Sequence, residues 1–154
     1  MGERDSYAPG VFCWADLGTT DAAAAKAFYT GLLGWEAEDL AAGDDGVYTM
    51  FRRDGRDVAA LYEMGAEERG ELPPHWSSYV SVDDVEAVAA RARELGATVV
   101  AEPFDVTDSG RMAVVRDPGG ALVHLWQAGR HIGAGCVNEP GCMVWNELAT
   151  PDVA

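Results

Sequence analysis

The sequence FYTGLLGW, residues 28–35, closes the most regular helical pattern of the chain. Apolar side chains recur there at the spacing of one helix face, at Ala25, Phe28, Tyr29, Leu32 and Leu33. Gly34 can adopt the left-handed conformation that ends a helix, and Thr20 or Asp21 can cap the start. We therefore expect a helix between these two signals.

Strands are expected on both sides of this helix. Residues 11–17 alternate, with Phe12, Trp14 and Asp16 on one face. Residues 47–53 and 57–64 are apolar runs joined through Asp54-Gly55, a strong hairpin signal. The predicted order of the first half is strand, helix, then strands.

The second half repeats this order after a polar segment, residues 65–74. Asp83 or Asp84 can cap a helical stripe that Gly96 ends. Strands are predicted at residues 76–82, 97–102, 111–116 and 121–127, the last two joined by the turn Asp117-Pro118-Gly119-Gly120.

Three stretches together resemble the vicinal oxygen chelate superfamily, which includes glyoxalase I, extradiol dioxygenases, fosfomycin-resistance enzymes and bleomycin-binding proteins. They are FYTGLLGW, SVDDVEAVAARARELGATVV at 81–100 and RMAVVRDPGGALVHLWQ at 111–127. The resemblance implies an α+β fold of two βαβββ modules, at about 9–65 and 75–128, which form a curved mixed sheet around a cleft.

The opening of the chain recurs near its end. Residues 9–23 and 140–154 match at seven of fifteen positions, with Trp14 displaced by 131 residues to Trp145. Chance is the alternative, but a repeat of this length is typical of a duplicated domain. We expect a domain at 9–128, a glycine-rich linker at 129–139, and the first strand of a truncated second domain at 140–154. Similar duplication occurs in two-domain glyoxalase-like proteins of actinobacteria.

The superfamily's chemistry uses a divalent metal held by His, Gln or Glu on the first and last strands of two modules. The first-strand positions here fall on Trp14 and Ser77, and an indole offers no lone pair to a metal. In the first module, the last-strand position falls near Leu61 or Tyr62.

In the second module, the last-strand position falls on His124, where the family often has a carboxylate. The resemblance therefore leaves His124, with Glu63 or His75, as the ligands of a metal if one binds. The sequence favours the alternative, in which His124 is a hydrogen-bonded part of the cleft wall. We expect a cleft without metal or other cofactor.

The predicted cleft is aromatic with a few polar groups, which suits a flat or extended organic ligand. Its expected residues are Phe12, Trp14, Asp16, Tyr48, Trp76, Ser77, Tyr79, His124 and Trp126. The alternative is that these aromatic side chains only fill the core, and Asp16 can instead serve the helix that follows it. The sequence favours reversible binding of a small, partly aromatic molecule rather than catalysis.

Two other functions stay open. One is a metal-dependent glyoxalase-type lyase, isomerase or dioxygenase, and the other is an interaction module without a ligand. Metal dependence separates the first from simple binding.

Composition limits the partners. A formal charge of −15 with Lys26 as the only lysine disfavours nucleic acid and anionic membranes. The start of the chain lacks the basic and apolar regions of a signal peptide, and three cysteines without a CxxC pair suggest reduced thiols. We expect a cytoplasmic protein, and a homodimer, since an unpaired strand after residue 140 could join a sheet edge.

Overall fold

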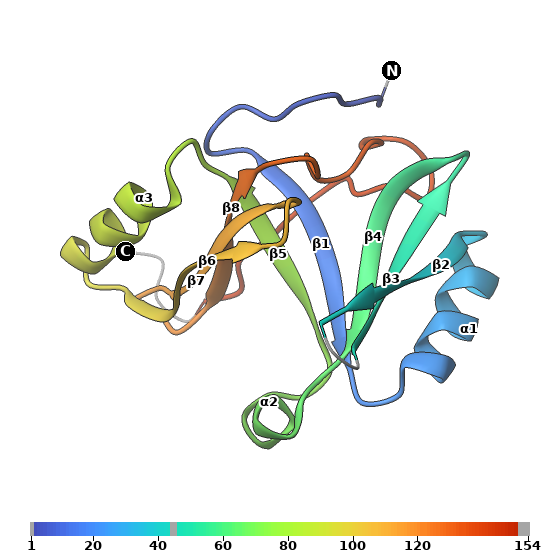
Figure 1. The fold of residues 1–154 in the computed structure, drawn as a ribbon, viewed down its shortest axis with the longest axis horizontal. Coiled ribbons are helices and arrows are strands. Elements are labelled where there is room, and N and C mark those ends of the chain that lie inside the picture. Colours follow the sequence, from blue (N-terminus) through green and yellow to red (C-terminus); the bar gives the residue numbers. More distant parts are fainter. Residues whose placement is uncertain (1, 44–45, 151–154) are drawn as a thin grey trace. The chain divides into compact units, whose positions relative to one another are not determined.

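The computed structural model describes residues 2–43 and 46–150. The elements in this part of the chain are β1 (Phe12–Thr19), α1 (Ala22–Leu33), β2 (Glu36–Ala42), β3 (Gly46–Arg53), β4 (Arg56–Glu63), α2 (Ala66–Glu71), β5 (His75–Ser81), α3 (Val85–Glu94), β6 (Thr98–Val106), β7 (Gly110–Arg116) and β8 (Leu122–Ala128) (Figure 1). None of the helices in the described ranges is long and apolar enough to cross a membrane.

The chain divides into two compact units. Unit 1 comprises Met1–Arg4, Trp14–Ser77 and Ala134–Val144, and unit 2 comprises Asp5–Cys13, Ser78–Gly133 and Trp145–Ala154. Helix α1 accompanies β1 to β4, and α3 accompanies β5 to β8, so a strand, a helix and three strands recur in that order. The predicted α+β class with paired βαβββ modules is therefore confirmed.

Unit 1 contains a mixed sheet in which β1 runs parallel to β4, while β2, β3 and β4 are antiparallel neighbours. Helix α1 begins at the predicted cap, because the Asp21 carboxylate accepts the Ala24 N–H at 2.9 Å, and it ends at Gly34 with φ of 67°. The helix packs on a core of buried side chains, which are Leu17, Phe51, Val58, Ala59, Leu61 and Cys136.

Unit 2 follows the same plan. Strand β5 runs parallel to β8, and β6, β7 and β8 are antiparallel neighbours. The Asp84 carboxylate caps α3 by accepting the Ala87 N–H at 2.9 Å. The helix covers a core made of Val82, Val85, Ala89, Ala113, Val115 and Leu125.

The residue pattern missed β2 and α2 and ended β6 four residues early. Every residue of β2 is exposed, so the strand shows none of the alternation between buried and exposed positions that reveals strands. Helix α2 is short and polar, and none of its residues is buried, which made it indistinguishable from a loop. Both elements depend on neighbours in space rather than on a periodic apolar face.

The segment after β8 is partly packed. Within the predicted linker at 129–139, Cys136 is buried in the core of unit 1. Beyond the linker, the Trp35 indole N–H donates to the Gly141 carbonyl oxygen at 2.7 Å. Residues 144–150 lie in no strand, and residues 151–154 lie outside the described residues. The opening strand of a further domain therefore stays a prediction.

Candidate functional site

A hydrogen-bonded row crosses β1 and β3 in unit 1. The Trp14 indole N–H donates to the Tyr48 hydroxyl oxygen at 3.0 Å, and that hydroxyl donates to Asp16 Oδ2 at 2.9 Å. Trp14 and Asp16 are almost fully buried, with 3% and 2% of their surfaces exposed. Burial, followed by the negative charge of Asp16, raises the pKa of Tyr48 well above its ordinary value. Tyr48 therefore stays a protonated donor.

Tyr62 repeats this arrangement on the next strand. It lies opposite Tyr48 in the register of β3 and β4, and its hydroxyl donates to Glu68 Oε1 of α2 at 2.6 Å. Burial and the hydrogen bond to Glu68 raise the pKa of Tyr62. Each of the two phenols is thus held by a carboxylate from another element.

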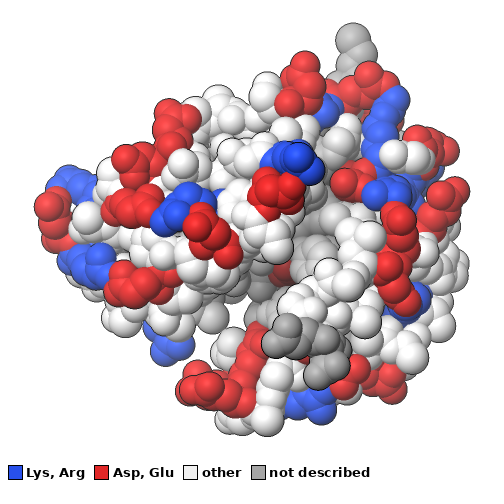
Figure 2. Space-filling model, viewed as in Figure 1, with Lys and Arg blue, Asp and Glu red and all other residues white. Residues whose placement is uncertain are grey.

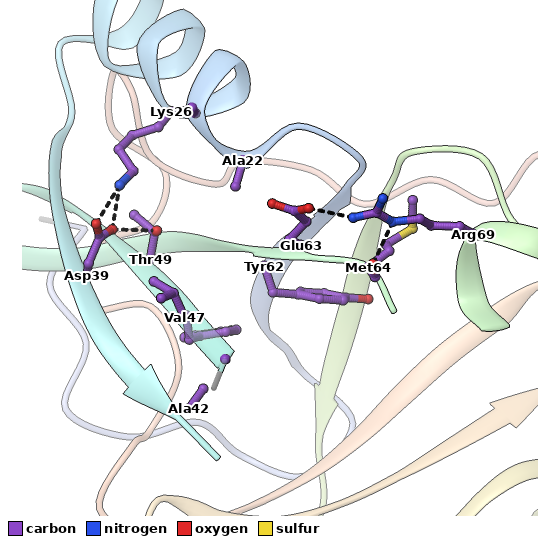
Figure 3. A pocket seen from close by; sticks show the side chains of 13 residues that line it. Ala22, Lys26, Asp39, Ala42, Val47, Thr49, Tyr62, Glu63, Met64 and Arg69 are labelled. Atoms are coloured by element: carbon purple, nitrogen blue, oxygen red, sulfur yellow. Dashed lines mark hydrogen bonds and ion pairs between the residues drawn. The ribbon is translucent and has the colours of Figure 1, made fainter. Parts of the chain in front are cut away.

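Both tyrosines line a pocket of about 750 Å³ in unit 1 (Figure 3). The volume lies within the range of small-molecule sites, about 300 to 1,000 Å³. The pocket's other lining residues are Ala22, Ala23, Lys26, Asp39, Ala42, Gly46, Val47, Thr49, Glu63, Met64 and Arg69.

Two ion pairs flank this pocket. Lys26 Nζ lies 2.6 Å from Asp39 Oδ1, which also accepts the Thr49 hydroxyl at 2.7 Å. On the other side in Figure 3, an Arg69 terminal nitrogen lies 2.5 Å from Glu63 Oε1. Hydrogen bonds from Lys26 and Thr49 lower the pKa of Asp39. Charged groups of both signs therefore border a pocket that contains aromatic and aliphatic side chains.

The nine predicted site residues fall into two sets. Unit 1 contains Trp14, Asp16, Tyr48, Trp76 and Ser77. Of these, only Tyr48 lines the pocket, and Trp14 and Asp16 hold its hydroxyl. Trp76 is 40% exposed and donates to the Tyr29 hydroxyl at 3.1 Å, whereas Ser77 is buried.

Unit 2 contains Phe12, Tyr79, His124 and Trp126. Tyr79 lies opposite His124 in the register of β5 and β8, and their ring centroids are 4.6 Å apart. The Trp126 ring meets the Tyr79 ring edge to face at 6.3 Å. Phe12 is 39% exposed. The predicted neighbours Tyr79, His124 and Trp126 therefore form one aromatic cluster.

Sequence reasoning did not select Tyr62, Lys26 or Arg69. Tyr62 carried a usable signal, because a short Asp-Gly hairpin places it near Tyr48 on the same face of the sheet. Lys26 and Arg69 carried none, since their ion pairs with Asp39 and Glu63 belong to no recognisable motif, and β2 and α2, which hold Asp39 and Arg69, show no periodic apolar face.

Three of the positions considered for a metal, Trp14, Glu63 and His75, make other contacts within unit 1. The Trp14 indole nitrogen donates to Tyr48 and has no lone pair to offer. Glu63 is paired with Arg69 and lines the large pocket, whereas His75 lines a different cavity and its Nδ1 lies 2.8 Å from the Pro73 carbonyl oxygen. No three His, Cys, Asp or Glu residues in the described part of the chain are grouped as a metal would require.

Comparison with known proteins places these features in context. Residues 12–125 match the model of the Glyoxalase/Bleomycin resistance protein/Dioxygenase superfamily. A Mycobacterium tuberculosis protein named "Putative glyoxylase CFP32" is 47% identical over 157 residues, covering 100% of this chain and 60% of its own length. The "Anthracycline biosynthesis protein DnrV" of Streptomyces peucetius is 38% identical, covering 96% of this chain and 58% of its own. The chain thus spans about three fifths of these relatives.

Among solved structures, methylmalonyl-CoA epimerase from Mycobacterium tuberculosis has a similar fold, with a TM-score of 0.58 at 19% identity. The match covers 82% of this chain and 92% of the epimerase.

Proposed function

Because the chain belongs to the Glyoxalase/Bleomycin resistance protein/Dioxygenase superfamily, we propose that it binds a small, partly aromatic organic molecule in the tyrosine-lined pocket of unit 1. We further propose that this binding needs no metal or other cofactor. The site is then a variant of the cleft expected from the sequence, with Tyr48 retained and Tyr62 added.

The observation that carries this proposal is the way the two phenols are held. Their hydroxyls donate to Asp16 and Glu68, and both phenols are protonated, so neither is poised to act as a base. What they offer a ligand in the pocket is ring surface. Offset-stacked or edge-to-face contacts between aromatic rings contribute about 0.5 to 1.5 kcal/mol each beyond area burial.

The cations of the two flanking ion pairs can orient the ligand in the pocket. Lys26 and Arg69 are 31% and 40% exposed at their side chains, so both cations can meet a polar ligand substituent without leaving their carboxylates. A flat molecule with polar groups at its periphery fits this distribution best.

One relative supports the aromatic class. DnrV is named for anthracycline biosynthesis, and anthracyclines are fused aromatic ring systems. Because this relative is similar to the chain, we propose a fused or extended aromatic ligand here too.

The name of the mycobacterial relative favours a second candidate, a metal-dependent glyoxalase-type reaction. It ranks second because Trp14 occupies one ligand position and Glu63 is engaged by Arg69. A homodimer in the cytoplasm also stays a proposal, which light scattering and cell fractionation can address.

The test has two parts. Elemental mass spectrometry on protein purified without chelator or affinity tag is expected to find no stoichiometric divalent metal, before or after addition of Ni, Zn, Mn or Fe(II). Calorimetric titration of the same protein with anthraquinone sulfonate is expected to show one saturable site. Tightly bound, near-stoichiometric metal would put the glyoxalase-type reaction first, and the absence of saturable binding by fused aromatic probes would overturn the ligand class.

A further inference from the structure

Unit 1 contains a second cavity, of about 430 Å³, that the proposed function does not use. It lies along one stripe of α1, at Asp21, Ala24, Ala25 and Phe28, which follow the i, i+3, i+4, i+7 spacing of a single helix face. Lys26 lies off this stripe and lines the large pocket instead. The two cavities therefore occupy different sides of the same helix.

Three aromatic rings border the second cavity. The Phe28 and Tyr29 centroids are 5.0 Å apart with their planes at 85°, and those of Tyr29 and Trp76 are 5.2 Å apart at 84°. The Trp76 indole N–H donates to the Tyr29 hydroxyl oxygen at 3.1 Å. Tyr29, which also stacks on Trp35, joins Phe28 and Trp76 into one aromatic wall of the cavity, and aromatic rings attract cations.

Two of these rings are exposed, and Tyr29 is half-buried. Phe28 is 58% exposed and Trp76 is 40% exposed, and no residue of α1 is buried although the helix is mostly apolar. Exposed aromatic surface beside a cavity is available to a ligand, and its burial by a ligand is favourable.

The charge around the cavity selects the ligand. Asp21 supplies a carboxylate and His75 an imidazole, and none of the described residues lining the cavity is a lysine or arginine. The nearest helical cation, Lys26, is neutralised by Asp39. The whole chain carries a formal charge of −15, and acidic side chains spread over the face shown in Figure 2. Aromatic faces and a negative potential both attract cations and disfavour anions.

We propose that this cavity is a binding site for a small organic ammonium ion, held by the aromatic wall of Phe28, Tyr29 and Trp76 and by the Asp21 carboxylate. The proposal is independent of the ligand proposed for the large pocket, because the two cavities share no lining residue.

The test compares choline with its uncharged carbon analogue, dimethylbutanol, by calorimetric titration of the whole protein. Since the two molecules have nearly the same shape, a difference in affinity reports the charge. We expect saturable binding of choline at one site and affinity for dimethylbutanol that is lower by about tenfold or more.

Three variants locate the site. Phe28→Leu keeps apolar bulk but removes one ring, and Asp21→Asn removes the charge but keeps an equally good helix cap. Each is expected to weaken choline binding by about threefold to tenfold. The matched control is Leu32→Ala, which alters a 61% exposed side chain on the same helix outside the cavity and should leave binding unchanged.

Equal binding of choline and dimethylbutanol would overturn the ammonium assignment, and so would wild-type choline affinity in both Phe28→Leu and Asp21→Asn. Failure of choline to bind at all would overturn the site. Tyr62→Leu, which alters the large pocket, is expected to leave choline affinity unchanged, so failure of one proposal is distinguishable from failure of the other.

Discussion

Tyr48 of β3 lies directly opposite Tyr62 of β4, and the hydroxyl of each donates to a carboxylate outside the β3–β4 hairpin. Asp16 comes from β1 and Glu68 from α2, so the pair is fixed by two elements that are distant from each other in sequence. The rings are therefore positioned before any ligand arrives, which reduces the entropy lost on binding.

Removal of the Tyr62 ring should lower the affinity for the proposed aromatic ligand more than removal of the Tyr62 hydroxyl does. Tyr62→Leu is expected to lower the affinity for anthraquinone sulfonate by about fivefold to tenfold, because one ring contact is lost. Tyr62→Phe keeps the ring and should change the affinity by less than about threefold. Calorimetric titration measures both, with Leu32→Ala as the control outside the pocket. Equal losses of affinity in Tyr62→Leu and Tyr62→Phe would mean that the hydroxyl, rather than the ring, contacts the ligand.

Tyr48→Phe should destabilise the fold. The hydroxyl accepts from the buried Trp14 and donates to the buried Asp16, so its removal takes a hydrogen-bond partner from each. We expect a loss of about 1 to 3 kcal/mol in the free energy of unfolding, measured by urea denaturation. Tyr29→Phe is the matched control, because its hydroxyl accepts from the exposed Trp76 and water can replace it there. A loss no larger than that of the control would contradict the structural role of the row.

The local signals explain how much of this arrangement was predictable. Asp21 and Gly34 bound α1 as expected, and Asp54 and Gly55 both have positive φ, at 51° and 74°, as the hairpin signal required. These features depend on residues close together in sequence. The βαβββ order followed from them and from the family resemblance.

The site was only partly predictable because its key contacts join distant elements. Trp14, Asp16 and Tyr48 were expected on one cleft wall, but the sequence could not show that they hydrogen-bond to one another. Glu68 and Arg69 lie on a helix without a buried residue, so no periodic pattern marked it. The two pockets depend on this packing and not on any motif.

Gly18→Ala should disturb the same site from β1. A Cβ at this position would lie 2.9 Å from the Tyr62 hydroxyl oxygen and 3.1 Å from Met64 Cγ, both of which would have to move. We expect weaker binding of anthraquinone sulfonate and a loss of about 1 kcal/mol or more in the free energy of unfolding. Titration and urea denaturation of one preparation measure both. Unchanged affinity would show that the position of the Tyr62 ring does not matter for the ligand.

Gly31→Ala, in contrast, should stabilise the protein. Gly31 lies inside α1, and a Cβ added there would have no atom within 4 Å among its described surroundings. Alanine restricts the unfolded chain and favours the helix, so the free energy of unfolding is expected to rise by about 0.5 to 1 kcal/mol. A decrease measured by urea denaturation would indicate that α1 needs this glycine for a contact made in solution.

The Lys26–Asp39 pair should contribute to stability only where Asp39 is ionised. Hydrogen bonds from Lys26 and Thr49 lower the Asp39 pKa in the folded protein, so the contribution is present above the unfolded pKa and is lost as pH falls through the folded pKa. The Asp39 side chain is 51% exposed, so solvent screening limits the contribution to less than about 1 kcal/mol. Lys26→Gln is therefore expected to be slightly less stable than the wild type at neutral pH and equal to it in acid. Urea denaturation across the acid range measures the difference, which should also shrink in high salt. A difference that persists below the folded pKa, or that does not respond to salt, would mean that the lysine acts through packing of its aliphatic chain rather than through its charge.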